Sequence, residues 1–176
     1  MRSLLPATLI LAIMACASAG AADKPAGWGP LQSLVGEWTG EGGGAPGAGT
    51  GRFSFKPDLQ GQILVRKNRA EYPATKDRPA MVHDDLMVVY RESPEAPLHA
   101  IYFDSEGHTI RYEVYGPPDG SAAVFLSAAE PAAPRYRLTY TPAGQDRLKI
   151  KFEIAPPGKT GEFATYIEAG ARRTSP

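Results

Sequence analysis

His83 and Asp85 are the residues whose types and spacing come closest to a metal-binding pattern. They lie two positions apart, so their side chains would share one face of a β-strand. Imidazole nitrogens and carboxylate oxygens both bind divalent cations, but a zinc site needs at least three protein ligands. The other histidines, His99 and His108, stand at the starts of expected strands and are expected at the surface. We therefore expect no metal site.

Arg66 is a second candidate, because an inward guanidinium can bind a carboxylate. It opens a basic run, residues 66–69, which directly follows the apolar residues 63–65. Neighbouring side chains on a strand face opposite sides. Arg66 would then point inward as a polar anchor for a ligand carboxylate or a haem propionate. The alternative is that the strand has left the core here, so that all four side chains are solvated.

Motifs for nucleophilic or phosphate chemistry are absent from the sequence. It contains no G-x-S-x-G, no H-E-x-x-H and no G-x-x-x-x-G-K-[ST] pattern. The glycine-rich residues 41–51 bridge two expected strands and open no helix. They therefore cannot form a phosphate-binding loop at a helix N-terminus. We expect no catalytic residue and no enzymatic activity.

Alternation of apolar and polar residues dominates the chain after Val35. Residues 148–154 alternate strictly, which is the pattern of a strand with one buried and one wet face. Turns rich in Gly, Pro and Asp separate such segments. The pattern predicts about ten strands, at residues 36–42, 49–56, 62–71, 81–91, 98–104, 108–116, 121–129, 135–141, 147–154 and 162–169.

The architecture follows from the short links between these strands. Short links make antiparallel hairpins, and the lack of crossover helices excludes a parallel sheet. A single sheet of this many strands closes on itself or splits into two layers. We expect an all-β fold, a single antiparallel up-and-down barrel at residues 36–173 with a short N-terminal helical turn at residues 30–35. A jelly roll is the alternative.

The inward faces of the expected strands are rich in aromatic residues. Concave apolar pockets with a few polar groups hold small ligands, although side chains can also fill a small barrel completely. The first hypothesis is a barrel that binds a small hydrophobic or amphipathic ligand. The alternative is a filled barrel that works as an envelope structural or interaction protein through outward Phe103, Tyr115 and Phe125. The expected ligand-lining residues are Trp38, Phe53, Phe55, Tyr112, Tyr136, Tyr140 and Phe152.

The N-terminal 22 residues are typical of a secretory signal peptide. Arg2 supplies positive charge, residues 4–14 form an uncharged apolar stretch, and residues 15–22 are small. Cleavage in this small-residue region would release the protein into the periplasm. Alternatively, residues 13–16 resemble a lipoprotein processing site, which would make Cys16 an acylated first residue tethered to the bacterial envelope. Residues 23–35 are expected to form a linker and the short helix.

The balance of charges limits the kinds of partner that the protein is expected to bind. Nineteen Lys and Arg balance 19 Asp and Glu among the 176 residues, and the formal net charge is +0. This balance predicts no surface for nucleic acid and no electrostatic attraction to a membrane. A lipid on Cys16 is thus the expected membrane contact, if there is one. Cys16 is also the only cysteine, which excludes an intrachain disulfide.

The sequence Gly36-Glu37-Trp38 resembles the G-x-W motif of the calycin superfamily, which includes lipocalins, fatty-acid-binding proteins and nitrobindin-like barrels. The wider run 36–42, the strand number and the export signal resemble exported bacterial nitrobindin-like barrels more than lipocalins. The resemblance implies a hydrophobic cavity and a structural pair of Trp38 with Arg172 or Arg173, a cation–π contact. In nitrobindins a late-strand histidine holds haem. The last two expected strands have none, so no cofactor is expected.

Overall fold

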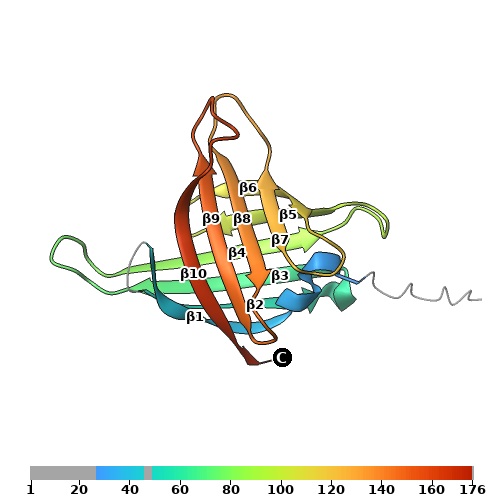
Figure 1. The fold of residues 1–176 in the computed structure, drawn as a ribbon, viewed down its shortest axis with the longest axis horizontal. Helices are drawn as coiled ribbons and strands as arrows, with labels where there is room; N and C mark the ends of the chain where they lie inside the picture. Colours follow the sequence, from blue (N-terminus) through green and yellow to red (C-terminus); the bar gives the residue numbers. More distant parts are fainter. Residues whose placement is uncertain (1–26, 46–48, 176) are drawn as a thin grey trace, which may run out of the picture.

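Ten antiparallel strands close into a barrel (Figure 1) in the computed structural model, which describes residues 27–45 and 49–175. Each strand pairs with its neighbour in sequence, and the first pairs with the last. The predicted all-β, up-and-down barrel is confirmed. The expected export signal and Cys16 lie outside the described residues. The strands are β1 (Gly36–Ala45), β2 (Thr50–Asp58), β3 (Ile63–Tyr72), β4 (Met81–Tyr90), β5 (Leu98–Asp104), β6 (Thr109–Tyr115), β7 (Ala123–Ser127), β8 (Arg135–Pro142), β9 (Arg147–Ala155) and β10 (Ala164–Ser175).

Strand β10 is longer than the sequence pattern predicts. The prediction ended this strand at residue 169, but the strand continues to Ser175. It must be long because it closes the ring, pairing with β9 through Arg172 and with β1 as far as Ser175.

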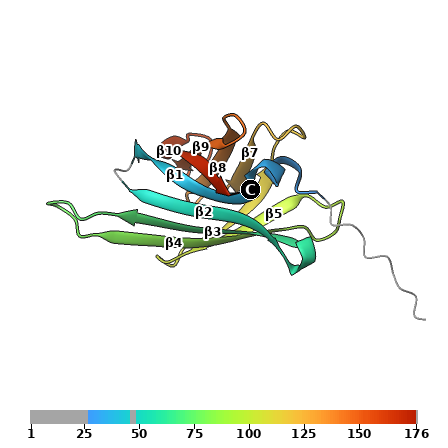
Figure 2. The same ribbon diagram turned by 90° about the horizontal axis from the view of Figure 1, so that it is seen from below.

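A short 3-10 helix, η1 (Gly29–Leu34), lies against one end of the barrel, and Figure 2 shows it beside the end of β10. Pro30 lies in its first turn, where a missing N–H costs nothing. Leu31 and Leu34 are 0% exposed. A second 3-10 turn, η2 (Leu59–Gly61), joins β2 to β3. Within the described residues, no helix is long and apolar enough to cross a membrane.

Large side chains fill the end of the barrel that η1 covers. Tyr140 stands at the centre, with ring centroids 5.5 Å from Phe55 and 6.0 Å from Phe125 in edge-to-face contacts, an arrangement that aromatic rings prefer. We call this packed group the plug. Its fully buried members are Leu31, Leu34, Trp38, Phe55, Leu64, Met87, Val89, Phe125 and Tyr140.

The expected outward position of Phe125 is wrong. Phe125 is 0% exposed, whereas Phe103 and Tyr115 lie on the surface. The pairing of Phe125 with Val114, whose side chain is also buried, places it on the inner face. The outward assignment failed because the parity of a short strand depends on this register, which a one-residue slip inverts.

Gly116 sits where η1 meets the barrel, and replacing it with alanine is expected to destabilise the protein. A Cβ atom there would lie 2.3 Å from the Ala122 carbonyl oxygen and 2.5 Å from Pro30 Cβ. The backbone must shift to relieve these contacts, which costs about 1 to 3 kcal/mol. Urea unfolding of Gly116→Ala measures this loss. The matched control is Gly161→Ala, because nothing lies within 4 Å of that Cβ position. Equal stability of the two variants would contradict the packing of η1 against Gly116.

Candidate ligand-binding site

The half of the barrel beyond the plug is hollow. A cavity of about 480 Å³ occupies it, a size typical of small-ligand sites. Its mouth is formed by the ends of strands that lie farthest from η1, with Tyr72, Glu106, His108 and Tyr166 among the lining residues. One half of the cylinder therefore supplies a packed core, and the other half encloses space.

One side of the cavity is an apolar wall contributed by β8, β9 and β10. Its main residues are Tyr136, Leu138, Ile150, Phe152 and Ile167. The Tyr136 and Phe152 rings stack with centroids 6.0 Å apart. Such flat aromatic and aliphatic surface contacts the carbon skeleton of a ligand favourably because it removes that skeleton from water.

The opposite side is a charged wall contributed mainly by β3, β4 and β5. Arg66 and Asp85 form a buried ion pair there, and Asn68 Nδ2 donates to Asp85 Oδ2 at 2.8 Å. Burial by itself raises the pKa of Asp85, but the Arg66 charge and hydrogen bonds from His83 and Asn68 outweigh it and lower the pKa. Asp85 is therefore ionised inside the barrel.

His83 joins the charged wall to the mouth. Its Nε2 lies 3.4 Å from Asp85 Oδ2 and 3.2 Å from the Tyr102 hydroxyl, and its Nδ1 lies 3.0 Å from Glu106 Oε1. Its hydrogen bond with Asp85 and its contact with Glu106 raise the pKa of His83 to about 9, against the opposing effect of burial. Without another cation at this place, His83 is charged at neutral pH.

Asp104 shapes the turn after β5. Its Oδ1 accepts hydrogen bonds from the backbone N–H groups of Glu106 and His108 at 3.0 and 2.9 Å. Its Oδ2 lies 2.8 Å from His108 Nδ1 and accepts from the Tyr102 hydroxyl at 3.3 Å. Burial opposes ionisation, but the hydrogen bonds with His108 and Glu106 outweigh it and lower the pKa of Asp104.

Two buried polar atoms, one on the charged wall and one in the plug, have unused hydrogen-bonding capacity. The Arg66 Nε and the Tyr140 hydroxyl make no hydrogen bond within the described residues. The Arg66 guanidinium lies 5.5 Å from the Phe53 ring centroid, so an apolar face packs against it. A buried donor without a partner costs free energy, and Arg66 lines the cavity. A ligand oxygen that reached Arg66 would supply the missing acceptor.

The structure divides the seven aromatic residues expected to line a ligand site. Phe53, Tyr112, Tyr136 and Phe152 line the cavity. The other three, Trp38, Phe55 and Tyr140, are buried members of the plug. Residues of both groups face inward, and their height along the barrel decides which group they join.

Of the two arginines considered as partners of Trp38, Arg173 is the one that packs on it. The Arg173 guanidinium lies 4.1 Å from the Trp38 ring centroid and donates to the Ser33 carbonyl oxygen at 2.7 Å. The Trp38 Nε1 donates to the Leu34 carbonyl oxygen at 2.8 Å. Arg172 is exposed. Trp38 and Arg173 together thus bind η1 to the closed end of the barrel.

Sequence reasoning missed three site residues, Tyr102, Asp104 and Glu106. They become neighbours of His83 only because β4 pairs with β5 in a register that sets Asp85 opposite Asp104. A signal was present in the spacing, since Asp104, Glu106 and His108 alternate through one turn. The expectation of no metal site paired only His83 with Asp85 and placed His99 and His108 at the surface.

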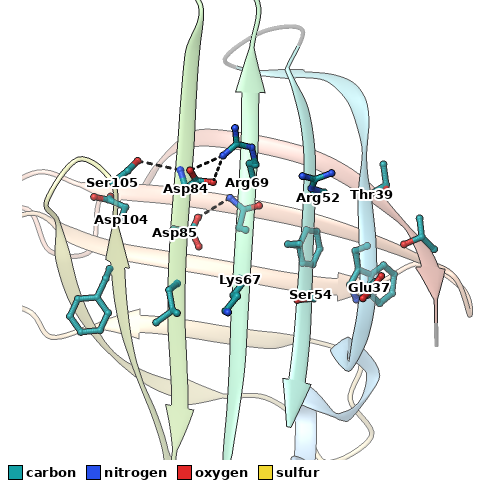
Figure 3. Close-up of a pocket in the computed structure, with 16 residues that line it drawn as sticks. Glu37, Thr39, Arg52, Ser54, Lys67, Arg69, Asp84, Asp85, Asp104 and Ser105 are labelled. Carbon is teal, nitrogen blue, oxygen red and sulfur yellow. Dashed lines mark hydrogen bonds and ion pairs between the residues drawn. The ribbon is translucent and has the colours of Figure 1, made fainter. Parts of the chain in front are cut away.

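A second hollow lies on the outer face of β1 to β5, and Figure 3 shows the side chains that line it. Its volume is about 690 Å³. Among the lining charges, Arg69 pairs with Asp84 at 2.9 Å and also with Glu71 at 2.8 Å. This hollow is more open to the surface than the interior cavity, so the interior cavity is the better candidate site.

The histidines that line the cavity lie outside the last two strands, where the nitrobindin resemblance would place a haem ligand. The lining histidines are His83 and His108, from β4 and the turn after β5, and neither β9 nor β10 carries one.

The closed ten-stranded antiparallel barrel, with a hollow half that opens at one end, is consistent with a calycin-like fold. It defines a class of small β-barrels whose candidate site is internal. No protein-family model and no curated protein matches this chain.

Proposed function

We propose that the protein is an exported lipocalin-like binding module that holds a small amphipathic molecule inside the barrel. The observation that supports this most is the cavity of about 480 Å³, in which an apolar wall faces a charged one. A ligand with a carbon skeleton and a polar end matches both walls at once. An entirely apolar ligand would remove water from the charged wall and leave the Arg66 Nε without an acceptor, which is costly.

The polar end of the ligand is assigned to Arg66. Its Nε lacks a hydrogen-bond partner within the described residues, and its other guanidinium edge pairs with Asp85. A carboxylate, carbonyl or hydroxyl oxygen would accept from this Nε. The skeleton would then lie along Ile150 and Phe152, with the ligand entering at the mouth.

The alternative is an envelope structural or interaction protein with a filled barrel. That alternative expects side chains to occupy the whole interior. The cavity supports the binding function instead, because the plug fills only one end. A free periplasmic form, or a form tethered through Cys16, belongs to the same proposal. Mass spectrometry of the mature N-terminus from expressing cells distinguishes the two forms, and an uncleaved chain would contradict export.

Filling the cavity is expected to abolish ligand binding and leave the barrel folded. Ala169 lines the cavity on β10, so Ala169→Trp places an indole in the space that the ligand needs. The probe is cis-parinaric acid, a fluorescent fatty acid with a carboxylate head. We expect saturable binding to the full chain with one probe per chain. In Ala169→Trp the affinity should fall at least about tenfold, which corresponds to a loss of about 1.4 kcal/mol of binding free energy.

The matched control is Glu168→Trp, which adds the same side chain to the neighbouring, exposed position on the outer face. It should bind the probe like the natural protein. Dodecanoate should displace the probe, and dodecane should not. Absence of saturable binding, or equal weakening by both tryptophans, would refute binding in the interior.

A further inference from the structure

We propose that the mouth of the barrel binds a divalent transition-metal ion through His83, Asp104 and Glu106. One ligand atom from each of these three lies within 4.8 Å of the others. His83 Nδ1 lies 3.0 Å from Glu106 Oε1, a separation close to that between ligand atoms that surround one ion at about 2.1 Å. His108 Nδ1 lies 2.8 Å from Asp104 Oδ2 and so helps to orient that oxygen.

The strand register creates a need for positive charge at this place. Pairing of β4 with β5 sets Asp85 opposite Asp104 (Figure 3), and like charges directly opposite each other destabilise a sheet. Arg66 neutralises Asp85. The Asp104 side chain is 4% exposed, yet its ion pair within the described residues is with His108. The ion pairs of Glu106 are likewise with histidines.

A divalent ion balances these charges. With both imidazoles neutral, Asp104 and Glu106 together carry two negative charges, and the Arg66–Asp85 pair beneath them is neutral. An ion of charge +2 at the mouth would make the whole constellation neutral.

The neighbouring groups already orient the ligand atoms. Asp85 and Tyr102 both face Nε2 of His83, which turns Nδ1 toward Glu106. A carboxylate on the far nitrogen of a ligating histidine is a usual feature of metal sites. In Asp104 the backbone N–H groups hold Oδ1, so Oδ2 is the oxygen directed at the proposed ion.

The ligand types select the metal. Mixed imidazole and carboxylate sets suit Zn²⁺ and its first-row neighbours, whereas Ca²⁺ and Mg²⁺ prefer oxygen ligands alone. His83 and Glu106 line the cavity, so a coordination position not taken by protein would face the cavity. This inference does not rest on the proposed ligand, because the ion is bound by side chains alone.

The test is a calorimetric titration of the full chain, without a histidine tag and after chelation and dialysis, with Zn²⁺ alone. Co²⁺ is titrated in parallel and followed by its visible absorption. We expect one ion per chain with micromolar affinity or tighter, and a loss of at least about tenfold for His83→Gln and for Glu106→Gln, comparable with losses at other metal sites. His99→Gln is the control. His99 packs on Tyr90, away from the mouth, and this variant should bind like the natural protein.

Glu106→Gln keeps the test decisive if His83→Gln fails to fold, because the Glu106 side chain is 49% exposed and its loss leaves the core intact. Near-ultraviolet circular dichroism verifies the fold of each variant. Absence of saturable Zn²⁺ and Co²⁺ binding, or an affinity unchanged in folded Glu106→Gln, would overturn the proposal. No organic probe is present, so this result is independent of the fatty-acid titration.

Discussion

Replacing Arg66 with methionine should lower the free energy of unfolding by about 3 to 5 kcal/mol, the usual loss when one partner of a buried ion pair is removed. Arg66 is 8% exposed and Asp85 is 9% exposed. Methionine has a similar length and is expected to keep the contact with Phe53. The loss of unfolding free energy then comes from the unpaired Asp85 carboxylate and not from a cavity. Urea unfolding followed by tryptophan fluorescence measures it.

A double variant separates charge from packing. In Arg66→Met combined with Asp85→Asn, no charge is left unpaired, and the amide retains hydrogen-bonding capacity toward Asn68. This variant should be more stable than the sum of the two single losses implies, as residues in direct contact are non-additive. The surface control, Arg69→Met, breaks an exposed pair with Asp84 and should leave stability unchanged. Additive losses in the double variant would mean that the pair does not act as a unit.

Replacing Trp38 with alanine should remove about 3 to 5 kcal/mol of stability, typical of a large aromatic residue deleted from a core. Trp38 is 2% exposed and stacks on Phe53 with ring centroids 6.2 Å apart. Its loss also frees the Leu34 carbonyl oxygen and removes the face on which Arg173 lies. The measurement is the midpoint and slope of urea unfolding, together with thermal unfolding.

Two arginine variants test whether the Trp38–Arg173 contact stabilises the protein by holding η1 against the barrel. Arg173→Ala deletes the hydrogen bonds to Ser33 and Val35 and should increase hydrogen exchange of the Leu31 and Leu34 amides. Arg172→Ala, the exposed neighbour, should not. If both variants exchange alike, Arg173 does not hold η1 against the barrel.

Most of the fold could be predicted because period-two alternation is a local property of each strand. The strict pattern of residues 148–154 identifies β9 almost to the residue. Strand β10 was harder, since Gly170 resembles a strand end, and only the closing contact with β1 explains why the strand continues. The height of a side chain along the barrel axis could not be predicted either, because it too depends on contacts between strands. Phe53 and Phe55 share a face, yet one lines the cavity and the other belongs to the plug.

The charged wall could be predicted only in part. The alternation that places Arg66 inward is local, so its orientation could be considered from sequence. The neighbours of His83 could not, because Tyr102 and Asp104 come from the next strand and meet it through register alone. Composition did not indicate a charged wall inside the barrel, because the positive and negative charges of the whole chain cancel.

The division of the barrel into a packed end and a hollow end gives the chain two separate kinds of tolerance to mutation. Substitutions of Tyr140 or Phe125 disturb aromatic contacts within the plug. The need to remain folded therefore restricts which residues these positions can carry. Ile150 and Ala169 border open space. Side chains of other sizes at these positions should therefore cost little folding free energy. The residues around the hollow half can therefore change while the packed half keeps the barrel folded.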